Sequence, residues 1–136
     1  MISSPFLGAR GGRYIDAVYS PSRDDLMAEH RFDDVIYQYN DRRSQKNCEI
    51  PYRALVPRKI DGLLACGKSA MRYGPNFRAR CGMFLNGQAA GVAAALCVKQ
   101  GVQPRDLDVK LLQRVLYKDL HCPLAEGERL EELDLV

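Results

Sequence analysis

Several hallmarks of common functional classes are missing from this sequence of 136 residues. No run approaches about 18 consecutive apolar residues, which argues against a membrane-spanning helix. The N-terminal stretch MISSPFLGARGG has neither a basic region nor an apolar core, so we expect no signal peptide. The net charge is only +3 and the basic residues are scattered, which argues against a nucleic-acid-binding surface.

A CxxC pair is also missing, and the five cysteines are an odd number. Both observations favour reduced thiols over a disulfide framework or a zinc site. We therefore expect a cytoplasmic protein that binds no metal.

Length and composition fit a single domain over residues 1–136, with a core of ordinary size. The pattern predicts an α+β fold: short strands first, then a central Ala-rich helix and an amphipathic C-terminal helix. A first strand is expected over Arg13–Ser20, and a short helix capped at Ser20 runs to about Glu29. Two further strands are expected at Ala54–Val56 and Leu63–Cys66. The run FDDVIYQYN fits helix or strand equally well, and the polar residues Asp41–Glu49 are typical of a surface loop.

Two helices are predicted in the second half of the chain. The Ala-rich helix begins between Arg78 and Gly87 and stops near Gly101, which suits the left-handed position after a helix. The last helix runs from about Asp108, a favourable N-cap, to Leu120. Its apolar residues share one stripe, and the acidic tail after it is typical of a single helical turn.

The stretch NGQAAGVAAALCVKQGV, residues 86–102, stands apart from the rest because its side chains are almost all small. Small residues let a helix approach a sheet or a ligand closely. The first N–H groups of a helix are unpaired and carry positive partial charge, so NGQAAG at a helix start is a candidate clamp for an anion or a carbonyl. Plain packing is the alternative interpretation of the same residues.

A wider pattern favours the first interpretation. In order along the chain stand IPYR at residues 50–53, LLACG at 63–67, an Arg-containing loop with Arg78, and GQAAG at 87–91. This order resembles the C-terminal part of FAD-dependent oxidoreductases of the fumarate-reductase-like superfamily, in the group with an IPYR, AGR and GQAAG pattern. The resemblance covers nearly the whole chain.

The resemblance implies FAD as cofactor, with the helix N-terminus at the pyrimidine edge of the isoalloxazine ring. A positive dipole end there would stabilise the negative charge of the reduced ring. The implied cofactor-binding residues are Gly67, Lys68, Arg78, Gly87, Gln88 and Ala89. No side chain is identified as a catalytic acid, base or hydride-handling group.

The sequence departs from that pattern in one large respect. No GxGxxG motif follows a strand, so the unit that holds the adenosine half of FAD is not recognisable. We therefore interpret the chain as the C-terminal part of a flavoprotein, whose partner is a Rossmann-domain chain or a second copy of itself. In that case the Ala-rich face should be exposed or covered by association. The alternative is a non-catalytic interaction module derived from a flavoprotein.

Other residues receive ordinary interpretations. Cys66 and Cys81 have no pairing motif, so buried inert thiols are favoured over redox partners of a flavin. The adjacent acids Asp33 and Asp34 are expected on a solvated face. Met71 and Asn86 replace residues typical of the resembled group, which puts its substrate chemistry in doubt.

Overall fold

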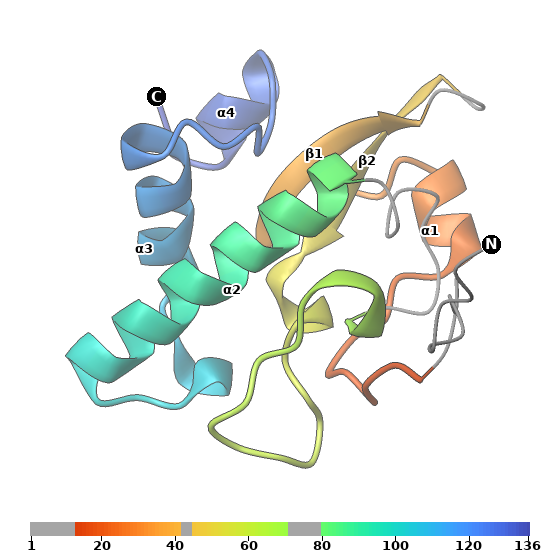
Figure 1. Ribbon diagram of the computed structural model, residues 1–136. Helices are drawn as coiled ribbons and strands as arrows, with labels where there is room; N and C mark the ends of the chain where they lie inside the picture. The colour runs from red at the N-terminus through yellow and green to blue at the C-terminus, as the bar shows by residue number, and fades with distance from the viewer. Residues whose placement is uncertain (1–12, 42–44, 71–79) are drawn as a thin grey trace, which may run out of the picture.

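The computed structural model describes residues 13–41, 45–70 and 80–136 (Figure 1). Within these residues it holds four α-helices and one two-stranded sheet, so the expected α+β fold is confirmed. In chain order the elements are α1 (Arg23–Met27), β1 (Val35–Asp41), β2 (Lys46–Pro51), α2 (Arg80–Gln100), α3 (Val109–Arg114) and α4 (Glu128–Glu132). Four short helical turns connect them: η1 (Tyr52–Ala54), η2 (Gly67–Ser69), η3 (Pro104–Asp106) and the π-helical η4 (Val115–Asp119).

Strands β1 and β2 form an antiparallel hairpin, with Tyr37 opposite Ile50 and an irregularity between Val35 and Tyr37. The run FDDVIYQYN thus resolves as a strand. The loop expected at Asp41–Glu49 is wrong from Lys46 onward, where the chain pairs with β1. The charged Glu49 favoured a solvated loop, but its carboxylate is buried against the guanidinium of Arg129. Local sequence does not reveal a partner so far along the chain.

The other expected strands are wrong as well. Ala54–Val56 forms the end of η1 and a bend. Leu63–Cys66 joins no sheet, and its Ala65 N–H donates to Leu55 O at 2.8 Å. Residues 13–20 contribute one isolated bridge, from Ala17 to Pro57. Ala54, Leu55 and Val56 are buried, but burial alone does not require strand pairing.

Helix termini follow local chemistry closely. Ser22, not Ser20, caps α1: its Oγ accepts from Asp25 N–H at 3.0 Å, while Ser22 N–H donates to Asp25 Oδ2 at 2.8 Å. Asp108 caps α3 as expected, accepting from Lys110 N–H at 2.9 Å. Gly101, at φ +67°, ends α2 with the bond from Val102 N–H to Cys97 O that defines a Schellman motif.

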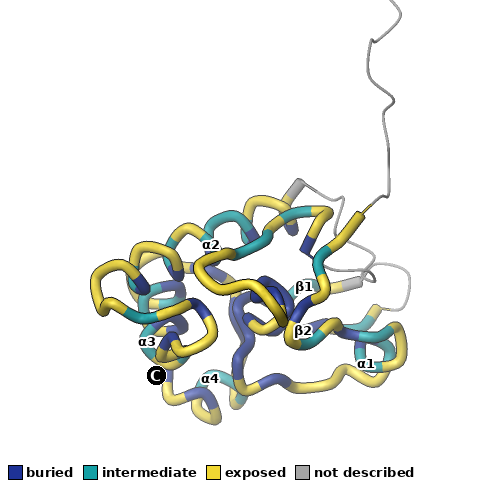
Figure 2. The backbone as a smooth tube through the Cα atoms, turned by 90° about the horizontal axis from the view of Figure 1, so that it is seen from below, coloured by how far each residue is buried: buried dark blue, intermediate teal, exposed yellow. Residues whose placement is uncertain are grey.

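Helix α2 crosses the molecule and contacts β1, η2, α3 and η4 (Figure 1). It buries one stripe, formed by Gly82, Asn86, Ala89, Ala93 and Cys97. The opposite face is open, with Phe84 74% and Val98 83% exposed (Figure 2). The expectation of an exposed Ala-rich face is met only in part among the described residues: Ala94 and Ala95 are exposed, whereas Ala89 and Ala93 are buried.

Asn86 is the polar member of the buried stripe. It is fully buried, and its Nδ2 donates to the hydroxyl of Tyr37 on β1 at 3.1 Å. Its Oδ1 is buried without a hydrogen-bond partner among the described residues. Burial raises the pKa of the Tyr37 hydroxyl, so this group stays protonated and available for hydrogen bonding.

Most of α2 is also apolar by composition. Among the described residues, one helical segment, Cys81–Gln100, is long enough and apolar enough to cross a membrane. Of its most apolar window, 28% is buried inside the protein. The core helix of a soluble protein meets the same criteria of length and composition. The expectation that the chain binds no membrane therefore stays a prediction.

A buried ion pair joins the C-terminal segment to the hairpin. Arg129 on α4 donates to Glu49 on β2 through Nε at 2.8 Å and Nη2 at 3.1 Å. The two side chains are only 11% and 5% exposed. Glu49 also accepts from the backbone N–H of Phe32 at 2.7 Å, and its proximity raises the pKa of the Arg129 guanidinium.

Glu49→Gln should destabilise the protein by on the order of 3 kcal/mol, because it leaves the buried Arg129 cation without its main partner. Urea unfolding followed by circular dichroism measures the change. Arg114→Gln, which removes a solvent-exposed pair with Asp134, is the matched control and should cost less than about 1 kcal/mol. Equal losses in the two variants would contradict this account of the C-terminal segment.

Candidate functional site

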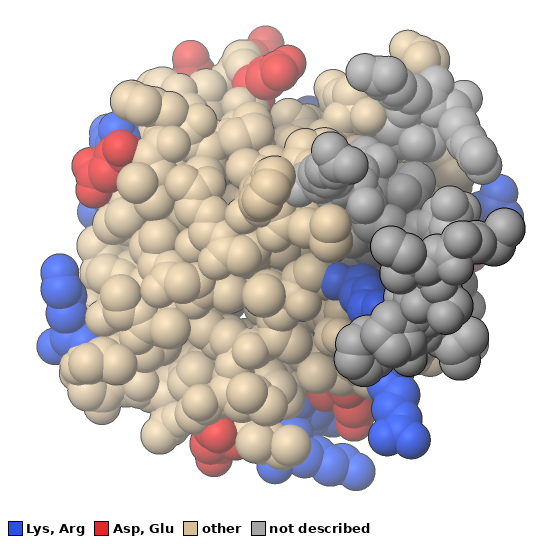
Figure 3. Space-filling model, in the orientation of Figure 1, with Lys and Arg blue, Asp and Glu red and all other residues tan. Residues whose placement is uncertain are grey.

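An apolar groove of about 610 Å³ runs along the open face of α2. One wall is the helix, through Gly87, Ala90, Gly91 and Ala94, and the other is the 62–66 segment. The far end is closed by the residues after α2, including Pro104. Among the described residues no carboxylate lines the groove, and most of the charged side chains visible on this face lie near its edges (Figure 3).

Two of the three glycines in α2, Gly87 and Gly91, leave open space in this groove. A Cβ added at either position would meet no atom within 4 Å. Glycine in a helix interior costs roughly 0.5–1 kcal/mol relative to alanine. No contact among the described residues requires glycine at these two positions.

The start of α2 differs from the sequence expectation in one respect. The helix begins at Arg80, within the predicted interval, but seven residues before Gly87. Gly87, Gln88 and Ala89 thus lie in the helix interior, where N–H groups bond the carbonyl four residues earlier. No strong helix breaker separates Arg80 from Asn86, so the helix extends through them, and the unpaired N–H groups belong to residues 80–83.

The structure brings some of the expected site residues together. Turn η2, which contains Gly67 and Lys68, contacts α2, and the preceding Cys66 lines the same groove as Gly87. Gly67 has φ +64°, a conformation that favours glycine, and Lys68 is exposed. These positions therefore border one end of the groove.

Other expected site residues point elsewhere. Ala89 is fully buried in the core stripe of α2. Gln88 turns toward the C-terminal segment, where its Oε1 accepts from the thiol of Cys122 at 3.0 Å. Arg78 lies outside the described residues.

Sequence reasoning missed the role of the residues at 50–53. Arg53 forms a bidentate pair with Asp34, at 2.9 Å and 3.0 Å, and Asp34 is nearly buried. The expectation of a solvated face for Asp34 is therefore wrong, while Asp33 is exposed. Tyr52 is buried, and its hydroxyl donates to Pro104 O at 2.9 Å. Because these partners lie 19 and 52 positions away, no local pattern indicated them.

Comparison with protein families identifies the chain. Residues 3–116 match the sequence model of the family described as FAD dependent oxidoreductase. The chain belongs to this family. Searches of curated proteins and of solved structures found no match.

Membership in the FAD-dependent oxidoreductase family makes the flavin the relevant group to test against the groove. Two observations bear on this test: open space beside Gly87 and Gly91, and the lack of a carboxylate among the described lining residues, which would otherwise repel the reduced, anionic ring. Neither observation conflicts with the ring half of the cofactor. Among the described residues, no cluster suited to a metal ion is present.

The thiols divide into two classes that the sequence did not distinguish. All five are thiols outside any disulfide; Cys66 and Cys81 are exposed, whereas Cys48, Cys97 and Cys122 are buried. The expectation that Cys66 and Cys81 are buried is thus wrong. Burial raises the pKa of the Cys97 and Cys122 thiols, which lowers their thiolate fraction at a given pH.

At pH 8, a disulfide reagent such as DTNB should modify two thiols rapidly and three only on unfolding, because the thiolate must be both formed and accessible. Peptide mapping should assign the rapid sites to Cys66 and Cys81. Rapid modification of Cys97 or Cys122 in the folded protein would contradict the packing of α2 described above.

Proposed function

We propose that this chain is the flavin-contacting part of an FAD-dependent oxidoreductase, and that the isoalloxazine ring lies in the groove beside α2. The observation that carries the proposal is the open, small-residue wall at Gly87 and Gly91 in a member of this family. When bound, FAD supplies the electron-accepting ring of the reaction. The chain supplies the surface that orients the ring and excludes water from one side of it.

The ring is placed by its neighbours and not by the helix dipole. The first turn of α2 begins at Arg80, roughly 10 Å before Gly87 at 1.5 Å per residue. Because the dipole effect falls off within about the first turn, it does not stabilise charge at Gly87. We place the pyrimidine edge of the ring at the Gly87 end of the groove because Cys66 and η2 lie there.

Positive charge around this end has a role in the proposal. Lys68 is exposed next to the groove, and α2 contains no acidic residue. A cation there favours binding of the ribityl phosphate and of the reduced ring, although a lysine lacks the bidentate geometry of an arginine. Arg78, the other implied cation, is included on the resemblance alone.

A second chain completes the site in this proposal. The sequence contains no recognisable GxGxxG unit for the adenosine half of FAD. We propose that a Rossmann-domain chain, or a second copy of this chain, covers the open face of α2. The exposed Phe84 and Val98 on that face support such a contact.

Gly91→Leu should weaken FAD binding about tenfold or more, because the new side chain fills the space that the ring would occupy. The absorbance spectrum of the purified chain and an FAD titration followed by flavin fluorescence measure binding. Ala95→Leu is the matched control: it adds a leucine on an exposed position of α2 outside the groove and should bind FAD like the unmodified chain.

Both variants should fold, because neither substitution meets the core, and thermal unfolding checks this. Equal FAD affinity in the two variants would exclude the groove as the ring site. The flavin role itself would be contradicted if the chain bound no FAD, either by itself or after mixing with a co-purified partner.

The second candidate function is a non-catalytic module that dimerises or docks through α2. The extent of apolar exposure on this helix favours it, since monomeric proteins rarely leave so continuous an apolar face uncovered.

For this candidate, light scattering coupled to size exclusion should report a mass above 15.3 kDa that rises with concentration. The double change Phe84→Gln and Val98→Gln should return the protein to a monomer, since it removes the most exposed apolar groups of α2. A monomer at all concentrations that also ignores FAD would argue against both candidates.

A further inference from the structure

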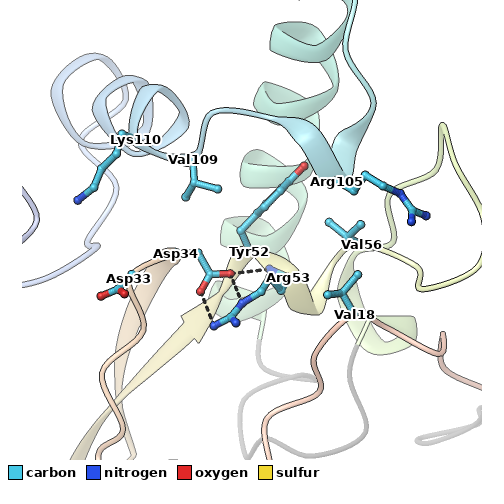
Figure 4. Close-up of a pocket in the computed structure, with 9 residues that line it drawn as sticks. All are labelled: Val18, Asp33, Asp34, Tyr52, Arg53, Val56, Arg105, Val109 and Lys110. Atoms are coloured by element: carbon cyan, nitrogen blue, oxygen red, sulfur yellow. Dashed lines mark hydrogen bonds and ion pairs between the residues drawn. The ribbon is translucent and has the colours of Figure 1, made fainter.

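A second cavity, separate from the groove, lies where four segments of the chain meet (Figure 4). Its volume is about 470 Å³, within the range of small-molecule pockets. It shares no lining residue with the groove beside α2. The cavity is lined by Val18, Asp33, Asp34, Tyr52, Arg53, Val56, Arg105, Val109 and Lys110.

The walls of this cavity are apolar. Val18 and Val56 lie on one side and Val109 on the other, with the ring of Tyr52 between them (Figure 4). Val18 and Val56 come from neighbouring segments joined by a bond from Val18 N–H to Val56 O at 2.8 Å. A short hydrocarbon or aromatic body suits this slot, because it would bury apolar surface on several sides.

A guanidinium group closes one end of the slot (Figure 4). Arg53 directs Nε and Nη2 at Asp34, and its carbon Cζ lies 5.2 Å from the centre of the Tyr19 ring. These two contacts fix the plane of the guanidinium. Among the described residues no acceptor faces its Nη1, and the side chain is 47% exposed, so donors remain for a ligand.

The charges around the cavity are nearly balanced, which leaves the oriented guanidinium of Arg53 as its anion-binding feature. The lining contains three cations, Arg53, Arg105 and Lys110, and two carboxylates, Asp33 and Asp34. Arg105 is paired with Asp61, outside the lining, at 2.5 Å, and Lys110 donates to Leu133 O at 3.1 Å. These partners hold the two charged side chains near the rim of the cavity, so they do not fill the slot.

Long-range hydrogen bonds hold the walls in place before any ligand arrives. The Tyr52 hydroxyl donates to Pro104 O, and Tyr52 N–H donates to Asp34 O at 2.7 Å. Behind the Asp33 side, the buried Gln113 donates through Nε2 to Asp33 O at 2.8 Å. Such preorganisation lowers the entropic cost of binding.

We propose that this cavity binds a small carboxylate with a short apolar or aromatic body. The carboxylate accepts hydrogen bonds from Arg53 Nη1, and the body lies between Val109 and the pair Val18 and Val56. The Asp34–Arg53 pair then serves to aim the guanidinium. This site is independent of the proposed flavin groove, so either proposal can fail alone.

The test uses benzoate as the probe and benzamide as its neutral counterpart, titrated into the full chain without FAD and followed by amide chemical shifts. Benzoate should give saturable shifts at residues of the cavity, with benzamide at least about tenfold weaker. Val18→Phe, which fills the slot and leaves the Asp34–Arg53 pair intact, should abolish the benzoate shifts. Val98→Phe, on the open face of α2, is the control and should not change them.

Arg53→Lys keeps the positive charge but removes the planar guanidinium. It should weaken benzoate binding at least about tenfold while leaving benzamide binding unchanged. Equal affinity for benzoate and benzamide would overturn the carboxylate assignment. Unchanged benzoate binding by Val18→Phe, or no binding by the unmodified chain, would overturn the site, even if Arg53→Lys failed to fold.

Discussion

The bidentate pair between Asp34 and Arg53 is the contact on which both cavities depend. It fixes the end of β2 against the start of β1, and Tyr52 between them is then held by Asp34 O and Pro104 O. Tyr52 forms the back of the carboxylate cavity, while Pro104 closes one end of the groove beside α2. Residues 52–53 therefore connect the lining of the carboxylate cavity to the end of the groove through Asp34 and Pro104.

Helix α2 has two contrasting faces. Its inner stripe of small residues allows close contact with β1 and α3, whereas its outer face is also rich in apolar residues and is exposed. The flavin site proposed above would account for this composition, since a helix between a core and a flat cofactor needs small residues on both sides.

The sequence predicted the features that arise from local chemistry. The Asp108 cap, the Gly101 terminus and the existence of α2 follow from propensity and capping within a few residues. Strand pairing, the Ser22 cap and the burial of Asp34 and Glu49 did not follow, because they depend on partners such as Arg53 and Arg129 elsewhere in the chain. At the candidate site, α2 begins within the predicted interval, but the motif GQAAG lies inside the helix and did not predict that Gln88 and Ala89 face away from the groove.

Asn86 has a consequence for how α2 is oriented about its own axis. A helix that is apolar on every side has no hydrophobic reason to present one face to the core over another. Its one fully buried amide, donating to Tyr37, favours the observed rotation, because another rotation would break this bond and leave the buried Tyr37 hydroxyl without it. In this chain one polar side chain favours a single orientation of α2 about its axis, and the direction in which Gly87 and Gly91 face follows from that orientation.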